Sequence, residues 1–288
     1  MSIRAVSAEN RAKIFRSKLG FTALFLFLCL LTFLFIVPLC WLLISSFMKP
    51  VEMFAVPIRW LPEKLNYENY IRMFNFFPFM RYLGNTLLIV VCNIVGSTVS
   101  SAFIAYGFSR LRWKGRDQVF VIVLITMILP FQVIMVPLFL LFHSFGWIGT
   151  FLPLTVTPFF GHAFSIFLIR QFFLSLPQEL NDAARIDGSG EFRTFFKIAI
   201  PLSTPVLVTV AIFAFQRSWN DFIGPLIFLL NDRLYTLAIA AMLIRAPIQP
   251  NWEILMPLGV VMILPVLIIF FITQKYFVQG IALSGIKG

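Results

Sequence analysis

The residue types that usually perform chemistry are sparse in this sequence, and none stands in a catalytic pattern. Histidine occurs only at His143 and His162, without the HExxH pattern of a zinc protease. A GxSxG nucleophile elbow and a GxxxxGK[ST] nucleotide loop are both absent. Cys29, Cys40 and Cys92 all lie in apolar runs, which argues against a disulfide framework or a zinc site. The sequence therefore predicts a protein that is not an enzyme, with no metal site and no cofactor of its own.

Charged groups that could couple transport to an ion gradient are just as scarce. Such transporters carry acids or histidines within their spans. Here the acid nearest to the interior of an apolar run is Asp221, one helical turn after Arg217. The two residues fit an i, i+4 pair at a membrane interface. If the chain transports a solute, we expect its energy to come from elsewhere.

The composition indicates an integral membrane protein. Of the 288 residues, 60% are hydrophobic and 12% are charged, whereas soluble domains have about 25% charged residues. A helix needs about 20 apolar residues to cross the bilayer. Six runs meet this length: 21–44, 83–109, 118–141, 151–169, about 198–217, and 254–274. A further run at 234–244 is too short to span and is predicted to be re-entrant or interfacial.

The charge distribution predicts the orientation. With six spans and the N-terminus inside, 15 of the 23 Lys and Arg residues lie inside, and the net charge is +9 inside against +2 outside. The expected domains are a cytoplasmic tail at 1–20, a six-helix domain at 21–273 and a cytoplasmic tail at 274–288. Outer loops are expected at 48–82, 142–150 and 217–253, and an inner loop at 170–201. The basic character follows from this topology, and nucleic acid is not an expected partner.

The spans carry packing features of their own. Small residues at Gly96 and Ser100 lie four apart on the second span, and Ser97 and Ser101 repeat the spacing. Such rows let helices approach closely. Pro130 and Pro158 interrupt the third and fourth spans, which predicts either local kinks or breaks that line a substrate path.

The long inner loop is the most patterned stretch. Ser175 and Gln178 fit a capping box before a short helix at 179–187, and Gly188 suits its end. A second short helix is expected at 192–198, stopping before Pro201. The pattern fits an amphipathic loop on the membrane as well as a docking surface for a cytoplasmic protein.

The same loop resembles the EAA signature of permease subunits in binding-protein-dependent ABC importers. Asp182, Ala183 and Ala184 are followed after three residues by Gly188, and after nine further residues by Ile198, Ala199, Ile200 and Pro201. The spacing matches throughout. The departures from the signature are Asp182 in place of Glu and Ile200 in place of Leu.

Further pieces resemble the carbohydrate-type branch of this family, which includes the second permease of the maltose importer. They are 45–47 (Ser-Ser-Phe), 69–70 (Asn-Tyr), 85–86 (Asn-Thr), 105–111 (Ala-Tyr-Gly-Phe-Ser-Arg-Leu), 114–117 (Lys-Gly-Arg-Asp), 176–177 (Leu-Pro), 183–188 (Ala-Ala-Arg-Ile-Asp-Gly), 219–221 (Trp-Asn-Asp), 274–280 (Gln-Lys-Tyr-Phe-Val-Gln-Gly) and 287–288 (Lys-Gly). The ordered set extends from the first span to the last residue.

The resemblance implies an all-α membrane protein of the type I ABC importer permease fold, in a bacterial or archaeal inner membrane. It implies a second permease subunit, two ATPase subunits that carry ATP and Mg²⁺, and an extracytoplasmic solute-binding protein as partners, with lipid around the spans. It implies sugar import, with glycerol-phosphate or another polyol as alternative cargo. From the residues alone, a stand-alone secondary transporter stays open, and an intramembrane enzyme is a more distant alternative.

The resemblance also implies roles for particular residues. The ATPase-coupling set on the short helix would be Glu179, Asp182, Ala183, Ala184, Asp187 and Gly188, and the tail contacts would be Lys287 and Gly288. By polarity, Gln132, Trp219, Asn220 and Asp221 are expected along the translocation path. For the last three residues, a tryptophan anchor followed by polar helix ends is an equal alternative.

Overall fold

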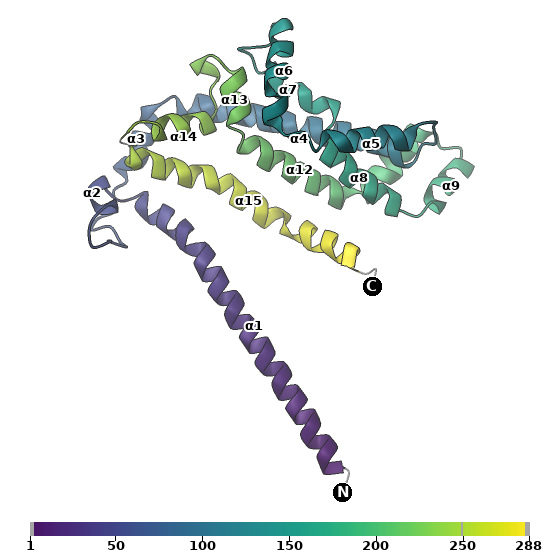
Figure 1. Cartoon of the computed structure of the whole chain (residues 1–288), viewed down its shortest axis with the longest axis horizontal. Coiled ribbons are helices and arrows are strands. Elements are labelled where there is room, and N and C mark those ends of the chain that lie inside the picture. Colours follow the sequence, from purple (N-terminus) through teal and green to yellow (C-terminus); the bar gives the residue numbers. More distant parts are fainter. Residues whose placement is uncertain (1–2, 249, 286–288) are drawn as a thin grey trace. The chain divides into compact units, whose positions relative to one another are not determined.

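The regular structure is helical throughout the part of the chain that can be described. The computed structural model describes the backbone of residues 3–248 and 250–285, and the side chains of residues 20–248 and 250–274. The helices are α1 (Ile3–Ser45), α2 (Pro50–Met53), α3 (Glu68–Phe76), α4 (Phe79–Ser109), α5 (Arg116–Thr126), α6 (Phe131–Ser144), α7 (Leu152–Thr155), η1 (Thr157–Phe160), α8 (Ala163–Ser175), α9 (Glu179–Ile186), α10 (Glu191–Thr194), η2 (Phe195–Ala199), α11 (Ile200–Leu202), α12 (Thr204–Trp219), α13 (Ile223–Phe228), η3 (Asp232–Leu234), α14 (Leu237–Arg245) and α15 (Trp252–Gly285) (Figure 1).

Four to six candidate membrane spans emerge from these helices. Four stretches are long and apolar enough to cross a bilayer: Gly20–Ser45, Phe79–Ser109, Leu152–Ser175 and Trp252–Gln274. Two bent helix pairs complete the set if each pair counts as one span. The pair α5 and α6 bends by 100°, and the pair Glu191–Leu202 and α12 bends by 79°. These stretches correspond to the six apolar runs of the sequence, and the short run at 234–244 forms the nine-residue helix α14.

The chain divides into two compact units, and the first is built around the end of α1. It comprises Met1–Met73 and Asn251–Val260. Asn69, which is 1% exposed, donates from Nδ2 to the carbonyls of Ser46 and Met48 at 3.0 and 2.8 Å. The hydroxyls of Ser46 and Tyr70 are 2.9 Å apart. The two Asn69 bonds satisfy carbonyls of the turn that follows α1.

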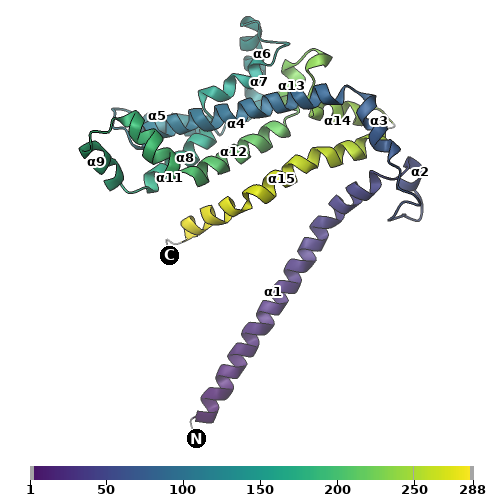
Figure 2. The ribbon, with the colours of Figure 1, turned by 180° about the vertical axis from the view of Figure 1, so that it is seen from behind.

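The second unit comprises Phe74–Pro250 and Val261–Gly288. Within it α8 and α12 both pack along α4 (Figure 2). A buried cluster joins these helices, including Ala105 on α4, Phe173 on α8 and Val210 on α12. The helix α9 lies at one end of this unit in both views.

The small residues on α4 permit the close approach that the sequence predicts. A Cβ on Gly96 would stand 2.9 Å from the ring of Phe159 and 3.1 Å from Pro158 Cβ. Ser100 Oγ donates to the carbonyl of Pro158 at 3.0 Å. A larger side chain at position 96 would push η1 away from α4.

Two local expectations of the inner loop are wrong. Ser175 ends α8 and donates to the carbonyl of Phe172, so the capping box with Gln178 does not form. The second short helix does not stop before Pro201, because α10 continues through the π-turn η2 into α11. In η2 the amide of Ile200 bonds to the carbonyl of Phe195, five residues back, and this wider turn bridges α10 and α11.

Candidate functional site

The helix α9 presents most of its surface outward. Asn181 and Ala184 are its buried residues. The other members of the predicted coupling set, Glu179, Asp182, Ala183, Asp187 and Gly188, are exposed. Asn181 and Ala184 lie three residues apart, so they mark the face that α9 turns toward its own chain. The opposite face is free to meet another protein.

The end of α9 forms a Schellman motif around Gly188. The amide of Ser189 donates to the carbonyl of Ala184 at 2.8 Å, and the amide of Gly188 donates to the carbonyl of Arg185 at 3.0 Å. Gly188 has a φ of +73°, in the left-handed region. Its surroundings are open, since a Cβ added at this position would meet no other atom within 4 Å. Glycine is therefore favoured here by backbone conformation rather than by space.

A chain of three polar side chains ties α9 to the core helix α4. Arg185 Nη2 donates to Glu191 Oε1 at 2.8 Å, and Tyr106 Oη donates to Glu191 Oε2 at 2.9 Å. The hydrogen bond that Arg185 donates to Glu191 raises the pKa of Arg185 above its ordinary value. Tyr106 is 5% exposed and belongs to the core of the second unit. Glu191 thus joins an exposed helix to a buried one.

Arg110 fastens the turn between α8 and α9 from the other side. It follows the last residue of α4 and is 8% exposed. Its guanidinium donates to the carbonyls of Phe173 and Leu176, the latter at 2.9 Å, and to Gln178 Oε1 at 2.9 Å. Burial lowers the pKa of Arg110 from its usual value. The side chain thus gives a donor to carbonyls at the end of α8 and just after it.

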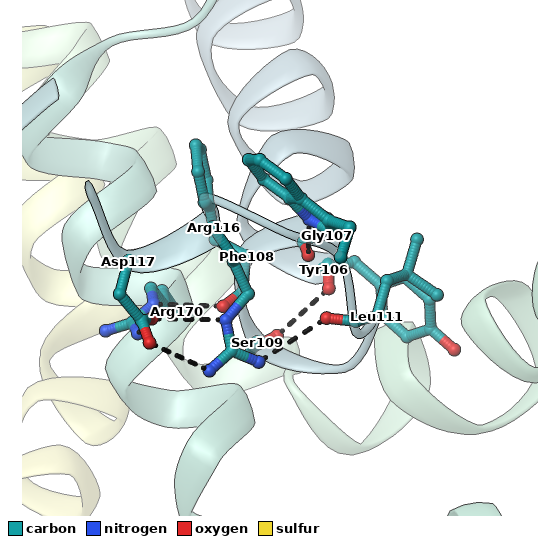
Figure 3. Close-up of polar contacts among 9 residues, drawn as sticks. Tyr106, Gly107, Phe108, Ser109, Leu111, Arg116, Asp117 and Arg170 are labelled. Carbon is teal, nitrogen blue, oxygen red and sulfur yellow. Dashed lines mark hydrogen bonds and ion pairs between the residues drawn. The ribbon is translucent and has the colours of Figure 1, made fainter. Parts of the chain in front are cut away.

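A second arginine holds the loop between α4 and α5. Arg170 Nε donates to the carbonyl of Phe108 at 3.2 Å, and its guanidinium lies 4.0 Å from the ring centre of Phe120. Asp117 accepts from both Arg170 and Arg116, at 3.4 and 3.1 Å (Figure 3). One polar network therefore joins the C-terminal parts of α4 and α8 to the start of α5.

The predicted path residues separate into two groups. Gln132 and Asp221 line one cavity of about 780 Å³ in the second unit. Trp219 is 2% exposed and donates from Nε1 to the carbonyl of Met262 at 3.0 Å. Asn220 is exposed and donates to the carbonyl of Gln216 at 2.8 Å. Trp219 and Asn220 do not line this cavity, and their place on the path stays a prediction.

Some residues of the network escaped the sequence reasoning. Arg110 and Arg170 counted there only among the 15 Lys and Arg residues predicted to lie inside, and Tyr106 and Glu191 received no role. The signals were an arginine directly at a helix end and a tyrosine within the family piece 105–111. The tail contacts Lys287 and Gly288 lie outside the described residues. The residues with described side chains hold no group of three His, Cys, Asp or Glu that could bind a metal.

Comparisons with known proteins place this architecture in a family. The family described as "Binding-protein-dependent transport system inner membrane component" matches residues 97–283. The arabinooligosaccharides transport system permease protein AraQ of Bacillus subtilis is 36% identical over 273 residues, which cover 92% of this chain and 95% of AraQ. The diacetylchitobiose uptake system permease protein NgcG of Streptomyces coelicolor is 31% identical, over 83% of this chain and 80% of NgcG.

A solved structure shares the fold. It is a chain from the crystal structure of a bacterial ABC transporter involved in the import of the acidic polysaccharide alginate. The TM-score is 0.79 at 23% identity, and the match covers 88% of this chain and 94% of the other. The membrane-spanning helices thus adopt the type I importer permease fold. By sequence and fold together, the chain belongs to the family of inner membrane components of binding-protein-dependent transport systems, as a multi-pass permease subunit.

Proposed function

We propose that this permease carries a sugar or oligosaccharide into the cytoplasm, and that α9 is the helix through which an ATPase subunit drives it. The substrate class is supported by the names of relatives that transport arabinooligosaccharides, diacetylchitobiose or lactose. Those names describe the relatives. The alignments with AraQ and NgcG cover most of this chain and most of each relative.

The observation that carries the proposal is the exposed apolar surface of α9 and its neighbour α10. Ile186 is 87% exposed, Phe192 is 76% exposed and Leu180 is 39% exposed. Exposed Asp182 and Asp187 flank them. Large apolar side chains held outside a protein, with charges at their rim, are typical of a docking surface.

The polar network gives this surface a mechanical connection to the spans. A force on α9 reaches α4 through Arg185, Glu191 and Tyr106. It reaches the end of α8 through Arg110. Rigid-body movement of a helix group, driven by a partner, is an established way to alternate access to a site. Asp182, Ala183 and Gly188 are proposed to position or contact the partner.

The proposal includes the rest of the assembly. A second permease would complete the pathway, two ATPase subunits would bind ATP and Mg²⁺, and an extracytoplasmic binding protein would deliver the solute. The inner loop at 170–201 and both tails would face the cytoplasm. The segments at 48–82, 142–150 and 217–253 would face outward.

The test is isolation of the tagged chain from native membranes in mild detergent, with partners identified by mass. We expect a stoichiometric ATPase and a second six-span permease. In proteoliposomes with the complete complex, uptake of labelled arabinotriose, diacetylchitobiose or lactose should require ATP. A homo-oligomer that imports without an ATPase, reproduced in several detergents, would instead support a secondary transporter.

A pair of variants tests the docking surface itself. Ile186→Arg should reduce ATPase recovery at least several-fold, because it places a charge within the exposed apolar patch. Ile248→Arg is the matched control, since Ile248 is also highly exposed but lies in the segment assigned to the outer side. Equal recovery of the ATPase with both variants would argue against docking at α9.

A further inference from the structure

Three breaks in the helices of the second unit meet at one cavity. Met127 and Leu129 come from the break between α5 and α6, Gly161 and His162 from the break before α8, and Asp221 from the break after α12. The cavity has a volume of about 780 Å³, within the range of about 300–1,000 Å³ typical of ligand sites. Interrupted helices are tolerated at membrane depth where they line a cavity.

Two glycines in the cavity lining allow their neighbours to pack closely. Gly161 has a φ of +90°, and a Cβ there would stand 2.6 Å from Ile104 Cδ1. A Cβ on Gly224 would stand 2.5 Å from Asp221 Oδ2. The amide of Gly224 donates to Asp221 Oδ1 at 3.0 Å. The carboxylate is therefore held against α13 by one oxygen, while its other oxygen lies beside a residue without a side chain.

The cavity also holds a buried hydroxyl that has no partner. Ser218 is 9% exposed and lines the cavity, and its Oγ makes no hydrogen bond among the described residues. A buried polar atom left without a bond costs free energy. Gln132 and Asn93 add amide groups to the same lining. A ligand that brings hydroxyl groups would satisfy Ser218.

The charged groups of the lining balance each other. Its titratable members among the described residues are His162, Arg217 and Asp221. Arg217 Nη1 approaches Nε2 of His162 at 2.9 Å. Because a ring nitrogen that accepts a hydrogen bond carries no proton, His162 is neutral in this arrangement. One guanidinium and one carboxylate remain, and they form no ion pair with each other within the described part of the chain.

We propose that this cavity binds one unit of an uncharged, polyhydroxylated ligand, with Ser218, Arg217 and Asp221 as its hydrogen-bonding groups. Arg217 donates, Asp221 Oδ2 accepts and Ser218 does either, which suits adjacent sugar hydroxyls. The rings of Phe131, Phe164 and Phe228 line the cavity and supply apolar surface for a sugar face. The balanced charges favour a neutral sugar over a uronate. This inference rests on the proposed function and names its substrate site.

Direct protection of an introduced thiol tests the site without the binding protein. The assembled permease–ATPase complex carries Gln132→Cys in a background without Cys29, Cys40 and Cys92. A water-soluble maleimide labels it in the presence of arabinotriose or digalacturonate. We expect arabinotriose to slow labelling at least threefold and digalacturonate to leave it unchanged. Gln216→Cys, on α12 but outside this cavity, is the matched control and should show no protection.

The variant Ser218→Ala separates a binding role from a structural one. Removing an unpartnered buried hydroxyl should leave the melting temperature of the complex equal or higher, whereas half-maximal uptake should need at least fivefold more arabinotriose. Unchanged uptake together with no protection at Gln132→Cys, in a complex that imports arabinotriose normally, would overturn this site and leave the proposed function intact. Stronger protection by digalacturonate would overturn the neutral ligand. Absence of ATP-dependent sugar uptake in the unmodified complex would reject the proposed function and this site with it.

Discussion

At the scale of single residues, Glu191 connects the exposed helix α9 to the buried helix α4. Its two carboxylate oxygens accept from different helices, Arg185 on α9 and Tyr106 on α4. An exposed pair such as Arg185 and Glu191 adds little stability by itself. The hydroxyl of Tyr106 is buried, so its bond contributes more to holding α9 in position.

This difference leads to a prediction for Tyr106→Phe and Glu191→Gln. Tyr106→Phe should destabilise the complex by about 1 kcal/mol, the typical net value of one hydrogen bond, and should reduce the sugar imported per ATP hydrolysed. Glu191→Gln should do the same. If Tyr106 and Glu191 stabilise the complex through their mutual hydrogen bond, the double variant will lose less stability than the sum of the losses in the two single variants. Thermal unfolding and the ratio of uptake to ATP hydrolysis measure both effects; strictly additive costs would show that the link is not used.

Arg110 provides a second prediction at this scale. Arg110→Met removes a charged donor from the carbonyls of Phe173 and Leu176 and from Oε1 of Gln178, and among the described residues only the Phe173 carbonyl keeps a backbone donor, the amide of Leu176. Each buried group that loses its partner costs about 1–3 kcal/mol, so we expect strongly reduced accumulation of the complex in membranes. Arg110→Lys should recover little, because an ammonium cannot reproduce the fork of a guanidinium. Arg112→Met, an exposed neighbour in the same loop, is the control and should accumulate normally.

At the scale of elements, the end of α9 depends on one backbone conformation. Gly188→Ala should cost about 1–2 kcal/mol, the penalty for a left-handed residue with a side chain, and Gly188→Val should cost more. Fraying of the last turn would displace Ile186 and lower ATPase binding. The control is Gly190→Ala, because Gly190 has a φ of −71° and also has open space around it. ATPase recovery equal in both alanine variants would exclude a need for glycine at position 188.

The elements show what sequence periodicity can and cannot predict. The six spans follow from run length, and the bend between α5 and α6 follows from Pro130, which caps α6 in an extended conformation. The continuation of α10 past Pro201 could not be predicted from run length or from the position of a proline. A π-turn depends on tertiary packing, and Phe195 within it is buried against the core.

The residues of the candidate site also differ in whether the sequence could predict them. Gly188 and the exposed acids of α9 could be predicted, because their signals lie within a dozen neighbouring residues. The link from Tyr106 to Glu191 joins residues 85 positions apart, and that from Arg110 to Gln178 joins residues 68 positions apart. Nothing in a local pattern pairs such residues. The packed fold was needed to show that they meet.

At the scale of the whole chain, residues of the family pieces make hydrogen bonds that stabilise the tertiary structure. Asn69 closes the end of α1 in the first unit. In the second unit, Asn85 donates to the carbonyls of Arg233 and Tyr235, each at 2.9 Å. Thr86 accepts from the amide of Leu237 at 3.0 Å. Each of these residues thus fixes a segment far away in the sequence.

The orientation of the whole chain in the membrane provides the last prediction. The segments predicted to lie inside carry a net charge of +9 and those predicted to lie outside carry +2, and basic segments near spans stay in the cytoplasm. In a background without Cys29, Cys40 and Cys92, a membrane-impermeant maleimide added to intact cells should label Lys64→Cys. It should label Lys114→Cys and Arg193→Cys only after permeabilisation. All three positions are exposed, so burial cannot mimic protection by the membrane. The opposite pattern would place α9 outside the cell, away from any ATP-driven partner, and would rule out the coupling role of α9 together with the predicted topology.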